Sequence, residues 1–230
     1  MRFNFSSDRI SGDVCRQKKT VKELGIDEAG RGPVLGPMIL AGVVVPKGKA
    51  ALLASWGVAD SKKFGSRRKG RDRRSLLADK IRRNFAHLVV SISSTTVDRY
   101  VRSGSLNVLE QETALRIIDT LPADTVFLDG RNLFGPIAGR GVHAIDGADR
   151  SHPCVAAASI LAKQVRDEEF ERLCAVYKDE YGDVGGRGYP NRITLDFVQW
   201  HLERYGMLPP FYRKSYRWKA LSMESGNRLR

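Results

Sequence analysis

The chain has 230 residues, of which 42% are hydrophobic and 28% charged, and its formal net charge is +13. This composition is typical of a globular protein and excludes a fibrous or largely disordered chain. The longest apolar run, residues 38–45, is too short to span a bilayer, and residues 1–20 lack the apolar core of a secretory signal. We therefore expect a cytoplasmic protein with a polar basic tail over residues 1–20.

The excess of positive charge favours a polyanionic partner, because it raises the local concentration of polyanions and makes binding salt-dependent. A membrane surface would call for a basic amphipathic helix with a continuous bulky apolar face, which the sequence lacks. Nucleic acid is therefore favoured. The cysteines, Cys15, Cys154 and Cys174, match no zinc-ligand spacing, and we interpret them as free thiols.

The first elements in chain order are two strands, over residues 23–28 and 35–45. The sequence Gly-Arg-Gly-Pro between them is a turn signal, which predicts a hairpin. The second strand is apolar at consecutive positions, as is typical of a strand covered on both faces. A basic segment follows at residues 62–83, and Leu77, Ile81 and Phe85 give its later half the pattern of an amphipathic helix.

Helices and strands then alternate. The patterns predict strands over residues 87–94, 125–129 and 141–145, and helices over 105–121, 153–178 and about 195–205. Pro153 suits a first helical turn, and Gly206 suits a helix end. This order predicts an α/β domain with a mixed sheet flanked by helices. We place that domain at residues 21–178, a small helical C-terminal part at 179–222 and a tail at 223–230.

Carboxylates stand at or near the ends of the predicted strands, where α/β sheets usually build sites. Asp27 and Glu28 precede a glycine turn, Asp129 ends a strand, and Asp149 precedes the long helix. Converging carboxylates repel one another, and hard divalent ions such as Mg²⁺ and Mn²⁺ are the usual reason for such a cluster. Neighbours on a strand face opposite sides, so Asp27 and Glu28 can share a site only where the strand bends or ends, as Gly30 permits. The alternative is ordinary turn chemistry.

Several segments together resemble ribonuclease HII. The opening segment, residues 25–33 (Gly-Ile-Asp-Glu-Ala-Gly-Arg-Gly-Pro), is similar to that family's first motif and is highly specific. Weaker matches follow in order as far as about residue 217: Gly36-Pro37, Asp60-Ser61-Lys62-Lys63, Leu128-Asp129-Gly130, residues 157–163 with Arg166-Asp167, Gly188-Tyr189-Pro190, and Arg213-Lys214-Ser215-Tyr216.

The resemblance implies an RNase H-like fold and a metal-dependent endoribonuclease that uses two divalent ions, Mg²⁺ or Mn²⁺. It implies hydrolysis of the RNA strand of RNA–DNA hybrids and cleavage 5′ of ribonucleotides embedded in duplex DNA, leaving 5′-phosphate and 3′-hydroxyl ends. It assigns the catalytic and metal-binding roles to Asp27, Glu28, Asp129 and Asp149. For the fourth carboxylate Asp146 is an alternative, because Gly147 replaces the lysine that often stands there in the family. Asp167, within the long helix, is interpreted as a charge on the helix surface.

The resemblance also supplies substrate-binding residues. Gly30, Arg31 and Gly32 would read the 2′-hydroxyl, which distinguishes RNA from DNA, through backbone groups; the bland reading is a tight turn. Tyr189 would pack on the sugar beside the ribonucleotide, although its residue type fits a core aromatic equally well. The candidate phosphate contacts are Lys62, Lys63, Arg213 and Lys214, with Ser159 and Lys163 as weaker ones.

Three alternatives have different consequences. Ribonuclease HIII carries an N-terminal extension, for which residues 1–20 are too short. A non-catalytic nucleic-acid-binding module would have lost the carboxylates. A transposase-like or resolvase-like nuclease would cut duplexes made of DNA alone. We expect the protein to act as a monomer on a duplex.

Overall fold

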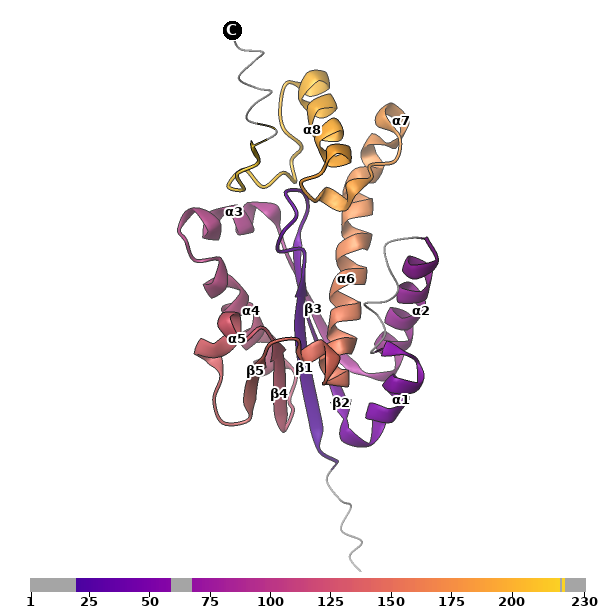
Figure 1. The fold of residues 1–230 in the computed structure, drawn as a ribbon, viewed down its shortest axis with the longest axis vertical. Helices are drawn as coiled ribbons and strands as arrows, with labels where there is room; N and C mark the ends of the chain where they lie inside the picture. The colour runs from indigo at the N-terminus through magenta and orange to yellow at the C-terminus, as the bar shows by residue number, and fades with distance from the viewer. Residues whose placement is uncertain (1–19, 59–67, 220, 222–230) are drawn as a thin grey trace, which may run out of the picture.

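The computed structural model describes residues 20–58, 68–219 and 221, and its centre is a five-stranded sheet in the order β3-β2-β1-β4-β5 (Figure 1). The pairs β1–β2 and β2–β3 are antiparallel, whereas β1–β4 and β4–β5 are parallel. The predicted mixed sheet is thus confirmed. Its strands are β1 (Lys22–Ala29), β2 (Met38–Pro46), β3 (Ala86–Ile92), β4 (Thr125–Asp129) and β5 (Val142–Ile145).

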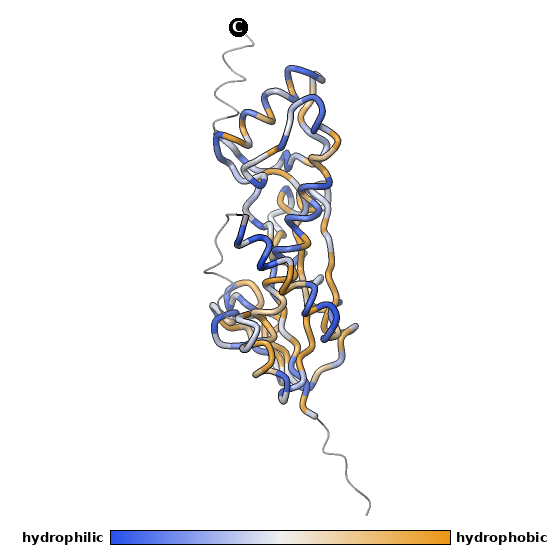
Figure 2. Tube along the Cα trace, turned by 90° about the vertical axis from the view of Figure 1, so that its right-hand side faces the viewer, coloured by the Kyte–Doolittle hydropathy of each residue, from blue (hydrophilic) through white to orange (hydrophobic). Residues whose placement is uncertain are grey.

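Helices cover both faces of the sheet. On one face the long helix α6 packs on β1 and β2, with α1 and α2 beside it; on the other face lie α3 and α4 (Figure 1). Seen from the α2 side, the hydrophobic strands run behind a largely hydrophilic helix (Figure 2). The helices are α1 (Ala50–Ser55), α2 (Arg68–Asn84), α3 (Ser94–Arg102), α4 (Leu106–Thr120), α5 (Arg131–Phe134), α6 (Pro153–Cys174), α7 (Lys178–Tyr181) and α8 (Arg192–Tyr205).

Small residues bring α6 unusually close to the sheet. A Cβ atom at Gly25 of β1 would lie 2.1 Å from the carbonyl carbon of Cys154, so only glycine fits there. The alanines at 156–158 are buried along the same contact. Burial raises the pKa of the Cys154 thiol to about 12, and Cys154 and Cys174 are both free, as expected. The close contact fixes the height of α6 above β1, on which the site depends.

The structure corrects several sequence-based boundaries. The strand predicted from residue 35 begins at Met38, because Pro37 has no N–H to donate to a sheet ladder. The two strands are therefore joined by a loop over residues 30–37 rather than by a tight turn. Helix α3 was not predicted, although Ser93 caps it by accepting a hydrogen bond from Thr96 N at 3.1 Å. The long helix ends at Cys174, not near 178.

The C-terminal part packs on the far end of α6 and on the loop 30–37. A third hydrophobic cluster joins Leu35 of that loop, Phe170 of α6, Phe197 of α8 and Phe211. Helix α8 ends at Gly206, which adopts φ = 70°, as predicted. None of the helices in the described residues has the length and apolar character needed to span a membrane.

Candidate active site

The sheet brings Asp27 and Asp129 together. In the parallel pairing of β1 with β4, Ile26 lies opposite Leu128, so the two aspartates occupy the next positions on neighbouring strands. Parallel strands lie about 4.8 Å apart. Asp27 is buried and Asp129 is half-buried. The structure therefore places at one edge of the sheet two carboxylates that the sequence separates widely.

Glu28 faces the opposite side of β1 from Asp27. Asp27 pairs with Ala41, which belongs to the cluster under α6, whereas Glu28 pairs with Leu40, which belongs to the cluster under α4. The strand alternation that made this pair doubtful as a single site is therefore present. Glu28 is nevertheless the last residue but one of β1, and it lies close enough to Asp27, Asp129 and the buried Glu110 for their charges to raise its pKa.

Burial and mutual repulsion dominate the electrostatics of the pair. Desolvation raises the pKa of Asp27 to about 6, with a smaller contribution from Asp129, although a hydrogen bond from Ser159 and the charge of Lys163 act in the opposite direction. Desolvation, followed by the charges of Asp27 and Glu110, raises the pKa of Glu28 to about 8. Near neutral pH Asp27 is therefore mostly ionised, whereas Glu28 holds a proton that a positive ion would displace.

Asp129 organises the turn that carries the fourth candidate. Its Oδ1 accepts hydrogen bonds from Gly147 N at 2.6 Å and from Ala148 N at 3.1 Å. Asp149 follows in the short 3-10 helix Ala148–Arg150 and is buried. Asp146 is exposed, and its carboxylate accepts a hydrogen bond from Arg131 N at 2.6 Å, at the start of α5. These contacts give Asp146 a structural role and favour Asp149.

The chemistry of these residues fits a divalent cation. Carboxylate oxygens are the ligands that hard ions prefer, and within the described part of the chain the buried Glu28 Oε2 has no hydrogen-bond partner. The arrangement is not a closed cage, since no three His, Cys, Asp or Glu side chains of the described residues gather tightly enough to enclose an ion. A positive ion nevertheless fits these residues: they offer carboxylate oxygens, Glu28 Oε2 has no hydrogen-bond partner, and the pKa of Glu28 is raised.

The loop 30–37 is fixed from several sides. Gly30 adopts φ = +87°, and a Cβ there would lie 2.7 Å from Pro37 O, so the bend at the end of β1 requires glycine. The Arg31 guanidinium pairs with the buried Glu110 and donates to Asn107 Oδ1 at 2.6 Å. The Arg31 carbonyl accepts a hydrogen bond from the Tyr216 hydroxyl at 2.6 Å. The backbone of this loop is therefore pre-organised next to the carboxylates.

Tyr189 stands beside this loop and is exposed. Gly188 O accepts hydrogen bonds from Val34 N and Leu35 N at 2.8 and 3.1 Å, which ties the two loops together. The Tyr189 side chain is 47% exposed, and its ring lies where a Cβ on Gly32 would touch it at 3.6 Å. Tyr189 is therefore not a core aromatic residue, which was the alternative interpretation of its residue type.

A cavity of about 360 Å³ lies beside Glu28, the loop 30–32 and Tyr189, and two of the cations in its walls, Arg74 and Arg187, were not among the residues singled out from the sequence. Arg74 of α2 and Arg187 ion-pair with Asp167 at 2.5 and 3.4 Å. Asp167, read from the sequence as part of the helix surface, is instead half-buried among arginines. The residues that line the cavity include Glu28, Gly30, Arg31, Gly32, Arg74, Lys163, Arg166, Asp167, Arg187 and Tyr189. The sequence signal for Arg187 was its position between Gly186 and Gly188, where it adopts a positive φ of 51°.

The candidate phosphate contacts differ in burial and in hydrogen bonding. Arg213 is fully buried and donates to Gly36 O at 3.0 Å and Arg31 O at 3.2 Å, so its prediction as a phosphate contact is corrected to a support for the loop. Lys214 is exposed. Ser159 is buried and bonds Lys163 Nζ at 2.5 Å, beside Asp27 rather than at the surface. Lys62 and Lys63 lie outside the described residues.

Comparison with known proteins agrees with this geometry. The family profile of ribonuclease HII matches residues 24–217. The chain belongs to the ribonuclease HII family. It is 40% identical over 210 residues to the ribonuclease HII of Methanothermobacter thermautotrophicus, covering 85% of this chain and 96% of that one. Ribonuclease HII of Cenarchaeum symbiosum is 37% identical over 211 residues, covering 88% and 98%.

Solved structures confirm the RNase H-like fold. Ribonuclease H2 of Pyrococcus horikoshii superposes with a TM-score of 0.77 at 28% identity, covering 91% of this chain and all of that one. Ribonuclease HII of Archaeoglobus fulgidus, solved in a complex with PCNA, gives 0.70 at 30% identity, covering 86% and 96%. A ribonuclease HIII shares the fold with a TM-score of 0.74 at 22% identity, covering 92% and 72%. This ribonuclease HII is thus a metal-dependent ribonuclease.

Proposed function

We propose that the protein, as a ribonuclease HII, hydrolyses the RNA strand of RNA–DNA hybrids and cuts 5′ of ribonucleotides embedded in duplex DNA, leaving 5′-phosphate and 3′-hydroxyl ends. The observation that carries this proposal is the register of β1 with β4, which sets Asp27 beside Asp129 at one edge of the sheet, while the next residue, Glu28, lines a cavity walled by cations. Carboxylates in such surroundings suit bound divalent ions, and the cations suit the phosphates of a nucleic acid.

The proposed ligands of two divalent ions, Mg²⁺ or Mn²⁺, are Asp27, Glu28, Asp129 and Asp149. When bound, such ions supply Lewis-acid activation of water and stabilisation of the departing oxygen in phosphoryl transfer. The protein contributes position. Asp129 fixes the turn before Asp149 through two backbone N–H groups, and Ser159 and Lys163 hold Asp27 from the α6 side.

Recognition of the ribonucleotide is proposed for the loop 30–32 and Tyr189. The backbone of the loop is anchored by Arg213 and Tyr216 beneath it, so its polar groups need little reordering when a 2′-hydroxyl arrives. The exposed Tyr189 ring offers an apolar surface for a sugar. Lys214 and the undescribed pair Lys62 and Lys63 remain proposed phosphate contacts.

The test is cleavage of three duplexes: DNA with one ribonucleotide, an RNA–DNA hybrid, and DNA alone. We expect Mg²⁺ or Mn²⁺ to support cleavage of the first two, chelator to abolish it, and the third to stay intact. Asp129→Asn should bind duplex without cutting it, because it keeps the shape but loses the charge. Cleavage of the all-DNA duplex, or full activity of Asp129→Asn, would contradict the proposal.

The role of Tyr189 has its own test. Compared with wild type, Tyr189→Ala should lower the ratio of cleavage of DNA with one ribonucleotide to cleavage of an RNA–DNA hybrid, because the surface for the sugar beside the ribonucleotide is removed. Tyr205→Ala on α8 is the matched control, since Tyr205 is also an exposed tyrosine, at 39%. An unchanged preference in Tyr189→Ala would refute the assignment. The monomeric state and the cytoplasmic location stay predictions.

A further inference from the structure

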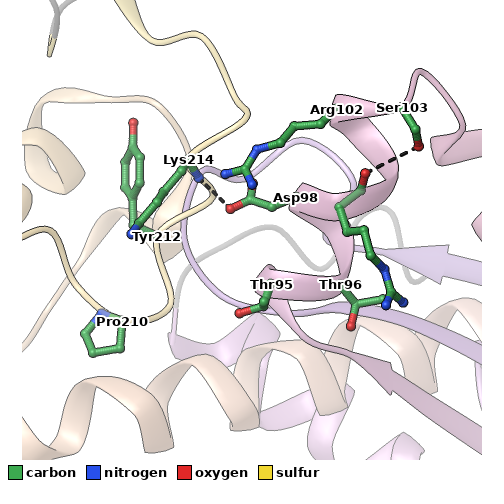
Figure 3. A pocket seen from close by; sticks show the side chains of 9 residues that line it. Thr95, Thr96, Asp98, Arg102, Ser103, Pro210, Tyr212 and Lys214 are labelled. Carbon is green, nitrogen blue, oxygen red and sulfur yellow. Dashed lines mark hydrogen bonds between the residues drawn. The ribbon is translucent and has the colours of Figure 1, made fainter.

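A second cavity, of about 770 Å³, lies between α3 and the loop that follows α8 (Figure 3). Thr95, Thr96 and Arg102 come from α3, whereas Pro210, Tyr212 and Lys214 come from the loop. None of the site residues discussed above lines it except Lys214. It is therefore separate from the cavity that Glu28, the loop 30–32 and Tyr189 line.

The lining of this cavity suits an anion. Arg99, Arg102 and Lys214 are exposed cations, against one carboxylate, Asp98. That carboxylate is buried and accepts hydrogen bonds from Lys214 N at 2.9 Å, Ser215 N at 2.9 Å and Ser215 Oγ at 2.6 Å. Asp98 is thus occupied in fastening the loop to α3, which leaves the cations as the dominant charges facing the cavity.

Neutral donors complete the lining. Thr95 and Thr96 stand in the first turn of α3, where a hydroxyl and the helix dipole both favour negative charge. Ser103 lies at the other end of the same helix, where its hydroxyl donates to backbone carbonyls of α3 and is therefore not available to an anion. Arginine guanidinium groups together with hydroxyls are the usual partners of phosphate oxygens. The cavity is open to solvent, which suits a polymer that passes across it.

Hydrogen bonds connect this cavity to the loop 30–32. Lys214 is fastened to Asp98 on one side, and its neighbour Arg213 donates to Arg31 O at 3.2 Å on the other. The segment 213–216 is therefore a short bridge between α3 and the ribonucleotide-recognition loop. A duplex seated on Tyr189 and this loop would continue toward α3 in one direction.

We propose that the cavity between α3 and the C-terminal loop binds backbone phosphates of the same duplex, on one flank of the ribonucleotide and outside the reaction centre. This inference rests on the proposed function, and it adds Arg99 and Arg102 to the substrate-binding residues. Phosphate contacts fix the register of a protein on a duplex without reading sequence. The cavity positions the duplex so that the scissile phosphate meets the carboxylates.

The experiment measures binding of a DNA duplex containing one ribonucleotide, in chelator to prevent cleavage, as a function of salt. The variant is Arg99→Gln/Arg102→Gln. Loss of two phosphate contacts should lower the salt slope by about two, so the ratio of variant to wild-type Kd should fall about twelvefold from 50 to 200 mM salt. Arg140→Gln is the matched control, because Arg140 is an exposed arginine beside the start of β5, at the other end of the sheet.

A charge-conserving variant and shortened duplexes make the result specific. Arg99→Lys/Arg102→Lys should restore most of the salt slope, which a folding defect would not allow. Removing the flank that reaches α3 should abolish the difference between variant and wild type, whereas removing the opposite flank should preserve it. A difference that persists with either flank removed would mean diffuse attraction and would overturn the proposal.

Different results would refute the proposed function and the phosphate site at α3. If wild type neither binds nor cuts the ribonucleotide-containing duplex, the proposed function is wrong. If wild type cuts it but the variant's Kd and salt slope match those of wild type, the function stands and the α3 cavity is not a phosphate site.

Discussion

Replacing Arg213 by methionine separates a structural role from a substrate contact. The guanidinium is fully buried and donates to Gly36 O, Arg31 O and the Tyr216 hydroxyl at 3.0–3.2 Å. Methionine fills a similar volume but donates nothing, so Gly36 O loses this donor at about 1–3 kcal/mol. The hydrogen bonds to the Tyr216 hydroxyl and to Arg31 O, which keeps the bond from that hydroxyl, are lost at about 1 kcal/mol each. Relief of the desolvation of the arginine, which lowers its pKa, offsets part of this loss.

We therefore expect Arg213→Met to lower the free energy of unfolding by about 2–4 kcal/mol. For a domain of this size that lowers Tm by about 2–4 °C per kcal/mol. Urea denaturation measures the first quantity and thermal denaturation the second. Arg217→Met is the control, because Arg217 is an exposed neighbour and its replacement should change stability little.

The contrary outcome is equally clear. If Arg213 were a phosphate contact, Arg213→Met would keep the stability of wild type and reduce the salt slope of duplex binding by about one. That result would refute the structural assignment and the burial argument behind it.

Three further predictions concern the strand end. The pKa values of Asp27 and Glu28 are raised above their usual values, so the stability they confer is present at acid pH and is lost as pH rises through about 6 and then about 8. Chemical denaturation of the metal-free protein at several pH values should show this decline in the free energy of unfolding. A flat profile would contradict it. Asp27→Asn removes a buried repelling charge, so at pH 8 the variant should have a higher Tm than wild type when both are free of metal, and it should not cleave when metal is added. A lower Tm would count against the repulsion. Gly30→Ala should cost about 1–3 kcal/mol, since a Cβ there meets Pro37 O, whereas Gly48→Ala, where a Cβ meets nothing within 4 Å, should not, as urea denaturation of both can establish.

Several strands and helices could be predicted from the sequence because their signals are local. The apolar run of β2, the Pro153 start of α6 and the Gly206 end of α8 each specify an element without tertiary information. Helix α3 was missed because its Ser and Thr residues lower helix propensity and its cap was overlooked.

Site residues were harder to predict where burial decides the role. Asp27 and Asp129 follow from strand ends, yet the sequence could not supply the register that places them side by side. Arg213 looked like a surface cation, and Asp167 like a solvated charge, since neither pattern encodes burial. Glu110, which holds Arg31, lies in a helix with no local sign that its carboxylate points inward.

The carboxylates gathered at the ends of β1 and β4 are proposed to bind the divalent ions of the enzyme. Isothermal titration of Mn²⁺ above pH 8, where the raised pKa of Glu28 no longer keeps it protonated, measures this binding. Wild type should bind the ion, and Asp27→Asn/Asp129→Asn, although folded, should not. Equal Mn²⁺ affinity in the two proteins would contradict the claim.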